Sequence, residues 1–191
     1  MRAAHRMIIG AALCMTLGLT GCGSMGSSTG ANFLYKNLTI ADGSTMAGEG
    51  HTVLFKGSPL ALSGTGIKVG DTLREANLTQ ADLSLVAITD TKGKGKVRII
   101  SVVPSLDTPF AQKRFAGEAH IANVTFLSDY RGAEFGKTYG LFLKVPHILA
   151  RTVMVVDAHD TVRFLQITPE LTQLPNLDEA FAVAKSLITG S

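Results

Sequence analysis

Apolar and polar positions along residues 51–191 fall into short blocks that predict strands and helices. Two alternating runs that flank Lys56–Pro59 predict a β-hairpin over residues 51–62. Apolar runs rich in β-branched residues predict further strands, at 83–88, 97–103, 123–128, 149–156 and 161–167. Apolar residues at helical spacing predict helices, at 109–119, 131–139 and 175–187. This order of elements predicts one α/β domain with a mixed sheet.

The most continuous apolar run is Val97–Val103, Val-Arg-Ile-Ile-Ser-Val-Val. Such a run predicts a strand that is buried on both faces in the middle of the sheet. The loop Pro104–Thr108 follows its carboxyl end, where α/β folds place functional residues. Thr108 is a favourable N-cap and Pro109 a favourable first residue for the helix that follows. We therefore expect the candidate site in this loop and at the start of this helix.

The first 21 residues have a different pattern. Two arginines precede an apolar stretch at 7–19, which is too short to span a bilayer comfortably. It ends in Leu-Thr-Gly-Cys22, which resembles the signal of bacterial lipoproteins. The resemblance implies that residues 1–21 are removed and that Cys22 is lipidated, so that the membrane is a partner of the chain. Gly23, in place of aspartate, implies the outer membrane with the chain facing the periplasm. An ordinary secretory signal or a short anchor is the alternative.

Residues 22–50 are rich in Gly, Ser and Thr and predict a flexible tether between the lipidated Cys22 and a domain at 51–191. The chain has two cysteines, and Cys14 lies in the segment expected to be removed. The mature chain then has neither a free thiol nor a disulfide. Removal of two arginines from 18 basic residues leaves 16 against 15 acidic ones. With no basic patch that contains aromatic residues, we expect no nucleic-acid partner.

From His51 to Leu187 the chain resembles bacterial thiol peroxidases, which are two-cysteine peroxiredoxins. The similar segments follow one another in the family's order: Thr52–Pro59, Val103–Thr108, Pro109–Phe115, Thr125–Ser128, Arg131–Phe135, Tyr139–Gly140 and Ala150–Asp157. The resemblance implies a thioredoxin-like (peroxiredoxin) mixed sheet flanked by helices, with an N-terminal β-hairpin. It also implies no cofactor and no metal.

The resemblance implies a redox chemistry that needs two thiols. The family reduces hydrogen peroxide and organic hydroperoxides, and thioredoxin is its reductant. A peroxidatic cysteine follows the Pro-Ser-x-Asp-Thr motif by three residues and attacks the O–O bond, and a second cysteine resolves the sulfenic acid. In this chain these positions are Ala111 and Ala116. The family's other site positions remain as Pro104, Thr108 and Arg151.

One copy of Ser105–Pro109 stands where the family has two similar segments, separated by the rest of the peroxidatic helix and a core strand. We interpret this junction as an in-frame loss that leaves the fold one strand–helix unit short. The remaining strand 97–103, helix 109–119 and strand 124–128 are then expected to form a right-handed βαβ crossover. We expect the smaller core to lower the stability of the domain.

The resulting hypothesis is a thiol-peroxidase-family lipoprotein that is catalytically impaired or inactive. The alternative is a non-enzymatic, membrane-tethered binding or scaffold protein on the same fold, and a homodimer is a further expectation. An active enzyme would have to use Cys22, which has no helix N-terminus to lower its pKa. Thioredoxin and a hydroperoxide would be partners only of such an active enzyme.

Other chemistries find less support. Four histidines, at positions 51, 120, 147 and 159, lack metal-type spacing. His159, between Asp157 and Asp160, suggests a polar hairpin turn before it suggests a metal site. Ser105 and Asp107 lack the Gly-x-Ser-x-Gly context of a hydrolase. Arg151 either pairs with a carboxylate such as Asp107 or clamps a peroxide, and both roles stay open.

Overall fold

The computed structural model describes residues 38–190. The predicted signal at 1–21, Cys14 and Cys22 lie outside these residues. No helix within 38–190 has the length and apolar character needed to cross a membrane.

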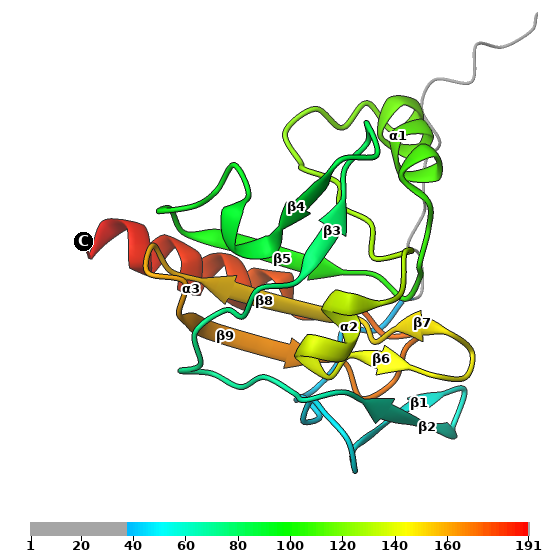
Figure 1. Ribbon diagram of the computed structural model, residues 1–191. Coiled ribbons are helices and arrows are strands. Elements are labelled where there is room, and N and C mark those ends of the chain that lie inside the picture. The colour runs from blue at the N-terminus through cyan, green and yellow to red at the C-terminus, as the bar shows by residue number, and fades with distance from the viewer. Residues whose placement is uncertain (1–37, 191) are drawn as a thin grey trace, which may run out of the picture.

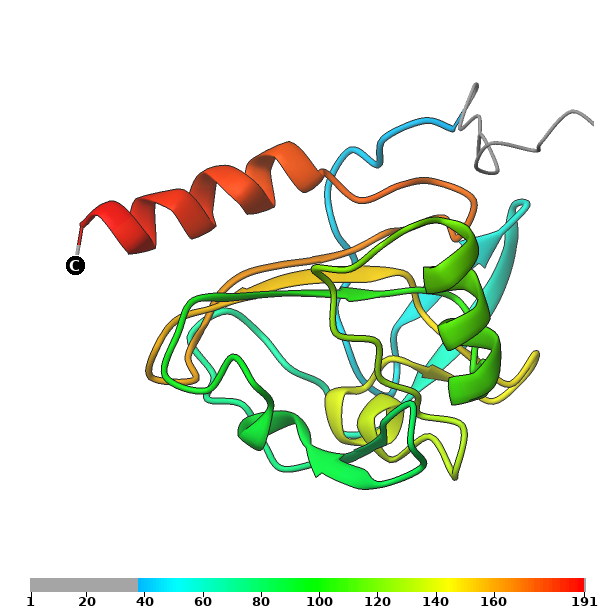
Figure 2. The ribbon, with the colours of Figure 1, turned by 90° about the horizontal axis from the view of Figure 1, so that it is seen from above.

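The main sheet has three strands in the order β5 (Arg98–Val102), β8 (Thr152–Val156) and β9 (Val162–Ile167), and both pairings are antiparallel. All five residues of β8 are buried, because helices cover both of its faces. Helix α3 (Leu177–Thr189) lies on one face, and the short helix α2 (Glu134–Tyr139) lies on the other (Figures 1 and 2). The buried centre of the sheet is therefore β8.

The predicted hairpin is confirmed as β1 (Thr52–Phe55) and β2 (Ser58–Ser63). Lys56 and Gly57 have φ values of 51° and 81°, as a tight two-residue hairpin turn requires. This hairpin joins β6 (Phe142–Leu143) and β7 (Ile148–Leu149) in a second sheet. A third sheet pairs β3 (Asn77–Thr79) with β4 (Leu85–Ala87), which continues into the 3-10 helix η1 (Ile88–Asp90).

Two hydrophobic clusters lie on the two faces of β8, since successive side chains of a strand point to opposite sides. Met154 and Val156 belong to the larger cluster, which also contains residues of α2 and of the smaller sheets. Val153 and Val155 pack against Ala180 and Ala184 of α3. The apolar face of α3 therefore fits the second side of the sheet through small residues.

The prediction that the apolar run at 97–103 forms a central strand, buried on both faces, is wrong. It forms β5, but β5 is an edge strand, and Ile99 and Val103 are 37% and 51% exposed. The strand expected at 123–128 also does not form. Its residues are joined to β3 by one antiparallel bridge, between Ser128 and Thr79, and the expected βαβ crossover is absent from the described residues. Without that strand, β5 has β8 as its single ladder partner.

The predicted helices are confirmed with small shifts. Helix α1 (Pro109–Glu118) begins after Thr108, α2 ends at Gly140 with φ 67°, and α3 covers nearly the predicted range. Helix α1 is the least integrated of the three, since Pro109 is its one buried residue and Phe110 is 62% exposed. Figure 1 shows α1 beyond the end of the three-stranded sheet instead of across its face.

The predicted flexible tether is wrong over residues 39–49, which belong to the fold. The Ala41 amide donates to the Leu174 carbonyl at 2.8 Å, and the Gly48 amide donates to the Gly140 carbonyl at 2.9 Å. Ala41 and Gly48 are also buried. Small residues allow this segment to approach the backbone of the domain closely, so the composition typical of a linker here serves packing.

Candidate functional site

The strand register brings the loop after β5 next to Arg151. Val102 lies opposite Thr152 in the β5–β8 ladder, so one step further places Val103 opposite Arg151. The Arg151 side chain is half-buried, and its Nε donates to the Leu171 carbonyl at 3.1 Å. Half-buried Pro104 follows in the same loop. The structure thus places Pro104 and Arg151 at the same end of the sheet, and the pairing of Arg151 with Asp107 stays a prediction.

Thr108 is the N-cap residue of α1. Its hydroxyl oxygen accepts a hydrogen bond from the Ala111 amide at 3.4 Å, which satisfies one of the amides that a helix start leaves without a partner. The Ser128 hydroxyl donates to the Asp107 carbonyl, and the Gln112 side-chain amide donates to the Leu127 carbonyl at 3.0 Å. These bonds hold the start of α1 against the segment that should have formed the next strand.

The two positions at which the resemblance predicts cysteines carry alanine side chains. Ala111 is the third residue of α1, Ala116 lies in its second half, and both are half-buried. Cys14 and Cys22 are the chain's two cysteines, and both precede residue 38. Residues 38–190 therefore contain no thiol that could react with a peroxide as a peroxidatic cysteine does.

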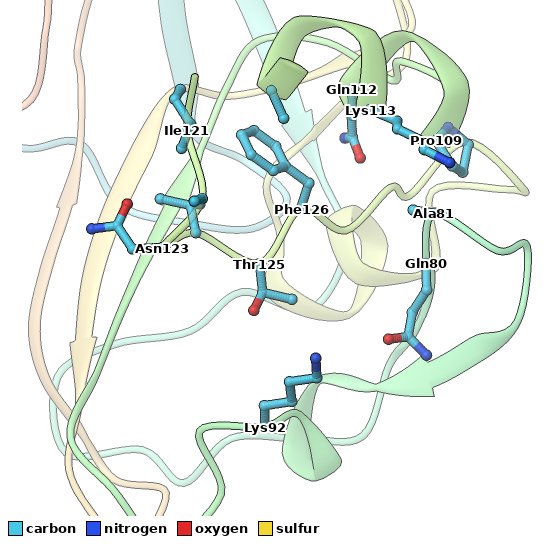
Figure 3. A pocket seen from close by; sticks show the side chains of 13 residues that line it. Gln80, Ala81, Lys92, Pro109, Gln112, Lys113, Ile121, Asn123, Thr125 and Phe126 are labelled. Carbon is cyan, nitrogen blue, oxygen red and sulfur yellow. The ribbon is translucent and has the colours of Figure 1, made fainter. Parts of the chain in front are cut away.

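A cavity of about 460 Å³ opens between α1, the segment 121–126, the start of the β3–β4 connection and Lys92 (Figure 3). Its lining combines amides, a hydroxyl, two lysines and apolar side chains, and Ala116 is among its residues. The lining residues include Gln80, Lys92, Gln112, Lys113, Ile121, Asn123, Thr125 and Phe126. Neither a carboxylate nor a thiol occurs among the described residues that line it. The amides, the hydroxyl and the two lysines can bind polar or anionic groups, whereas the lining offers no thiol for peroxide chemistry.

The turn Asp157–Asp160, which contains His159, stabilises the hairpin of β8 and β9. Within residues 38–190 no three His, Asp or Glu side chains gather in a way that could hold a metal ion. The Asp157 carboxylate accepts hydrogen bonds from the amides of His159 and Thr161 and from Arg163 Nε, at 2.8, 3.0 and 2.7 Å. Burial raises the pKa of Asp157, but these bonds outweigh it and hold the pKa below the usual 3.8. Asp160 pairs with Arg98, so the polar hairpin turn is confirmed.

Sequence reasoning missed two polar groups that the fold encloses. Half-buried Arg74 donates to the Thr138 carbonyl at 2.6 Å, and the Tyr139 hydroxyl donates to the Arg74 carbonyl at 2.6 Å. Burial raises the pKa of Tyr139 to about 12. Buried Asp129 accepts hydrogen bonds from the amides of Phe135 and Gly136, and burial still raises its pKa. The sequence signal for Asp129 was its place just before the helix predicted at 131–139, where an aspartate often accepts hydrogen bonds from the first amides of a helix.

Comparisons with known proteins agree with this architecture. The Redoxin family model matches residues 79–181. The thiol peroxidase of Halalkalibacterium halodurans is 35% identical over 166 residues, covering 72% of this chain and 99% of the relative. The thiol peroxidase of Streptococcus pneumoniae is 35% identical over 164 residues, covering 71% of this chain and 99% of the relative.

Solved structures show the same similarity. The peroxiredoxin-like protein from Aquifex aeolicus has a TM-score of 0.64 at 34% identity, covering 74% of this chain and 98% of that one. The thiol peroxidase from Chromobacterium violaceum has a TM-score of 0.65 at 16% identity, which shows the fold alone; it covers 73% and 98% of the two chains. The expected thioredoxin-like peroxiredoxin fold is confirmed. The similarity extends over nearly the whole length of each relative, and the chain therefore belongs to the thiol peroxidase family of peroxiredoxins.

Proposed function

We propose that this chain is a lipoprotein of the thiol peroxidase family that does not reduce peroxides. The observation that carries the proposal is that Ala111 and Ala116 stand where the family's two cysteines are expected, with no cysteine anywhere in residues 38–190. Cleavage of a peroxide by this family's route needs a thiolate that becomes a sulfenic acid, and a methyl group has no lone pair to attack oxygen. Without the resulting disulfide, thioredoxin has no substrate on this chain.

Arg151 and Thr108 support the descent of this chain from an active peroxidase. Arg151 lies opposite Val103 by register, and Thr108 still caps the helix that begins at Pro109. In an active site an arginine and a hydroxyl would stabilise a thiolate and orient a peroxide. In this chain the Thr108 hydroxyl accepts from the Ala111 amide instead, so the cap serves α1 alone.

A lost strand–helix unit accounts for the departure from the family. The match to the Halalkalibacterium halodurans relative has 166 positions, whereas 72% of this 191-residue chain is about 138 residues. The difference supports a gap of roughly one strand and one helix in this chain. The exposed outer side of β5 and the poorly packed α1 are the expected consequences of a missing neighbour.

Anchoring at Cys22 gives the domain its place at the cell envelope, with the outer membrane and the periplasmic side favoured by Gly23. Metabolic labelling with an alkyne fatty acid tests this part of the proposal. The expected result is a labelled protein whose label disappears in the Cys22→Ser variant. Equal labelling of both proteins, or no labelling of either, contradicts the anchoring.

A non-enzymatic binding role is the second candidate, and the cavity between α1 and residues 121–126 favours it. Its amides and lysines suit ligands with hydrogen-bond acceptors or negative charge. A ligand of this kind would use the space next to Ala116 without any need for catalysis. Protection of Asn123 and Thr125 amides from hydrogen exchange on addition of a ligand would identify such binding.

A peroxidase assay tests the catalytic part. The chain from Cys22 onward is given hydrogen peroxide or an alkyl hydroperoxide with thioredoxin, thioredoxin reductase and NADPH. We expect no NADPH oxidation above that of the Cys22→Ser variant, with the Halalkalibacterium halodurans relative as positive control. Turnover clearly above the Cys22→Ser variant would overturn the proposal. If insertion at Thr108 of the segment that the relative has and this chain lacks produces activity, the result supports the proposed deletion.

A further inference from the structure

Helix α3 carries an apolar stripe that the core does not use. Leu177, Phe181 and Ile188 are 39%, 54% and 64% exposed. At about 100° per residue these three positions lie within roughly 40° of one another around the helix axis. Ala180 and Ala184, on the neighbouring side, are the residues buried against the sheet. The stripe therefore borders the buried side of α3 and extends its apolar surface into solvent.

The first described residues of the chain lie beside the start of this helix. Ile40 forms a parallel bridge with Leu174, and the Leu174 amide donates to the Thr39 carbonyl at 2.9 Å. Leu38 and Ile40 are themselves 41% and 54% exposed. Figure 2 shows α3 as the outermost layer on its side of the sheet, with the chain's first described segment running next to its N-terminal end. We call Leu38, Ile40, Leu177, Phe181 and Ile188 together the α3 surface.

The chain outside the structure points to what covers this surface. Residues 23–37 separate the proposed anchor at Cys22 from Leu38. At about 3.3–3.6 Å per residue, this connection spans at most roughly 55 Å, so an anchored domain stays close to the bilayer. Because the connection enters next to α3, the shortest path to the membrane starts at the α3 surface. Tethering also makes contact with the bilayer an intramolecular event, for which a modest apolar area is sufficient.

We propose that the α3 surface docks onto the lipid bilayer, a role that rests on the proposed anchoring at Cys22. Phe181 and Ile188 would enter the boundary between headgroups and acyl chains, as the apolar side of an interfacial helix does. Exposed Lys185 lies one turn beyond Phe181 and can extend its ammonium group to lipid phosphates. The cavity and Arg151 lie outside this surface and take no part in the contact.

The chain's composition permits a direct test. It contains no tryptophan, and from residue 22 onward Cys22 is its one thiol. The chain from Cys22 to Ser191, with Phe181→Trp, is coupled through Cys22 to maleimide lipid in phosphatidylethanolamine–phosphatidylglycerol vesicles. We expect the tryptophan emission to move to shorter wavelength on coupling and to be quenched when the lipids carry brominated acyl chains. Replacing Ile188 and Leu177 with serine in the same protein should reduce the quenching.

A matched control places the tryptophan on another element. The Phe110→Trp variant, on exposed α1, is coupled in the same way and should show neither the shift nor the quenching. Emission at position 181 that coupling leaves unchanged, with vesicle attachment verified by flotation, overturns the proposal. So does an emission shift that grows with protein concentration without vesicles, since it assigns the surface to a second copy of the chain. Chemical coupling makes this result independent of whether cells lipidate Cys22, so the two proposals can fail separately.

Discussion

Replacing Asp160 with asparagine removes the counter-ion of a nearly buried guanidinium on the edge strand β5. The Arg98 side chain is 9% exposed and contacts the Asp160 carboxylate, while its other terminal nitrogen donates to the Ile88 carbonyl at 3.2 Å. Its Nε is buried without a hydrogen-bond partner among the described residues. Asp160 has φ 63°, a conformation that asparagine adopts readily, so Asp160→Asn changes the charge and leaves the backbone unstrained.

The size of the effect follows from burial. Breaking a buried ion pair costs about 3–5 kcal/mol because one charge remains without a partner. Asp160 is 25% exposed, and solvent screening on that side lowers the expected loss to about 2–4 kcal/mol. With an unfolding entropy of about 2.1 cal/mol/K per residue over residues 38–190, this loss corresponds to a Tm lower by about 6–12 °C.

Urea unfolding and thermal melting measure this loss against a matched control in the same chain. Asp90→Asn breaks the Lys94–Asp90 pair, whose side chains are 64% and 68% exposed, and should cost less than about 0.5 kcal/mol. Combining Arg98→Met with Asp160→Asn should recover part of the loss, since no buried charge then remains. Equal costs for Asp160→Asn and Asp90→Asn would refute the reasoning, because burial would then not decide the strength of the pair.

Three further predictions concern the fold around the site. A Cβ at Gly140, where φ is 67°, would lie 2.4 Å from the Gly48 nitrogen, whereas Gly95, with φ 73°, has open space around it. Gly140→Ala should therefore cost about 2 kcal/mol or more beyond Gly95→Ala in urea unfolding, and equal costs would contradict the close approach. Burial raises the pKa of Asp157, but its hydrogen bonds lower it more strongly, to below 3.8. The Asp157 carboxylate therefore binds fewer protons in the folded state than in the unfolded state. Its stabilisation is present at neutral pH and lost as the pH falls through the folded pKa, so the unfolding free energies of wild type and Asp157→Asn should converge on acidification; a pH-independent difference would be inconsistent with this account. A chain that begins at residue 51 loses the bonds of residues 39–49 and should melt below one that begins at residue 38, whereas equal Tm values would restore the tether interpretation.

Local signals explain why most elements could be predicted. Thr108 and Pro109 specify the start of α1, Gly140 ends α2 in a left-handed conformation, and the pair Lys56–Gly57 closes the β1–β2 hairpin. Each of these signals acts within a few residues of chain, where backbone sterics and capping bonds decide the outcome. The absence of a thiol at positions 111 and 116 is likewise a matter of sequence.

The residues of the candidate site came from a different source, and their roles stay predictions. Pro104 and Arg151 were identified by resemblance, and the β5–β8 register then placed them at one end of the sheet. The cavity beside Ala116 was not predicted, because its walls come from α1, the β3–β4 connection, Lys92 and a segment with no secondary structure. No pattern within one segment indicates which distant segment will face it.

Sequence alone determined that Val97–Val103 forms a strand, since its β-branched residues fit an extended, apolar environment. Tertiary structure alone decided that this strand lies at an edge, with Ile99 and Val103 partly exposed, and that the buried centre is β8. It also drew residues 39–49 into the fold and buried Arg98 against Asp160. The physical reason is that burial and strand pairing depend on which neighbours are present, whereas the apolar pattern of a strand records only its own preference.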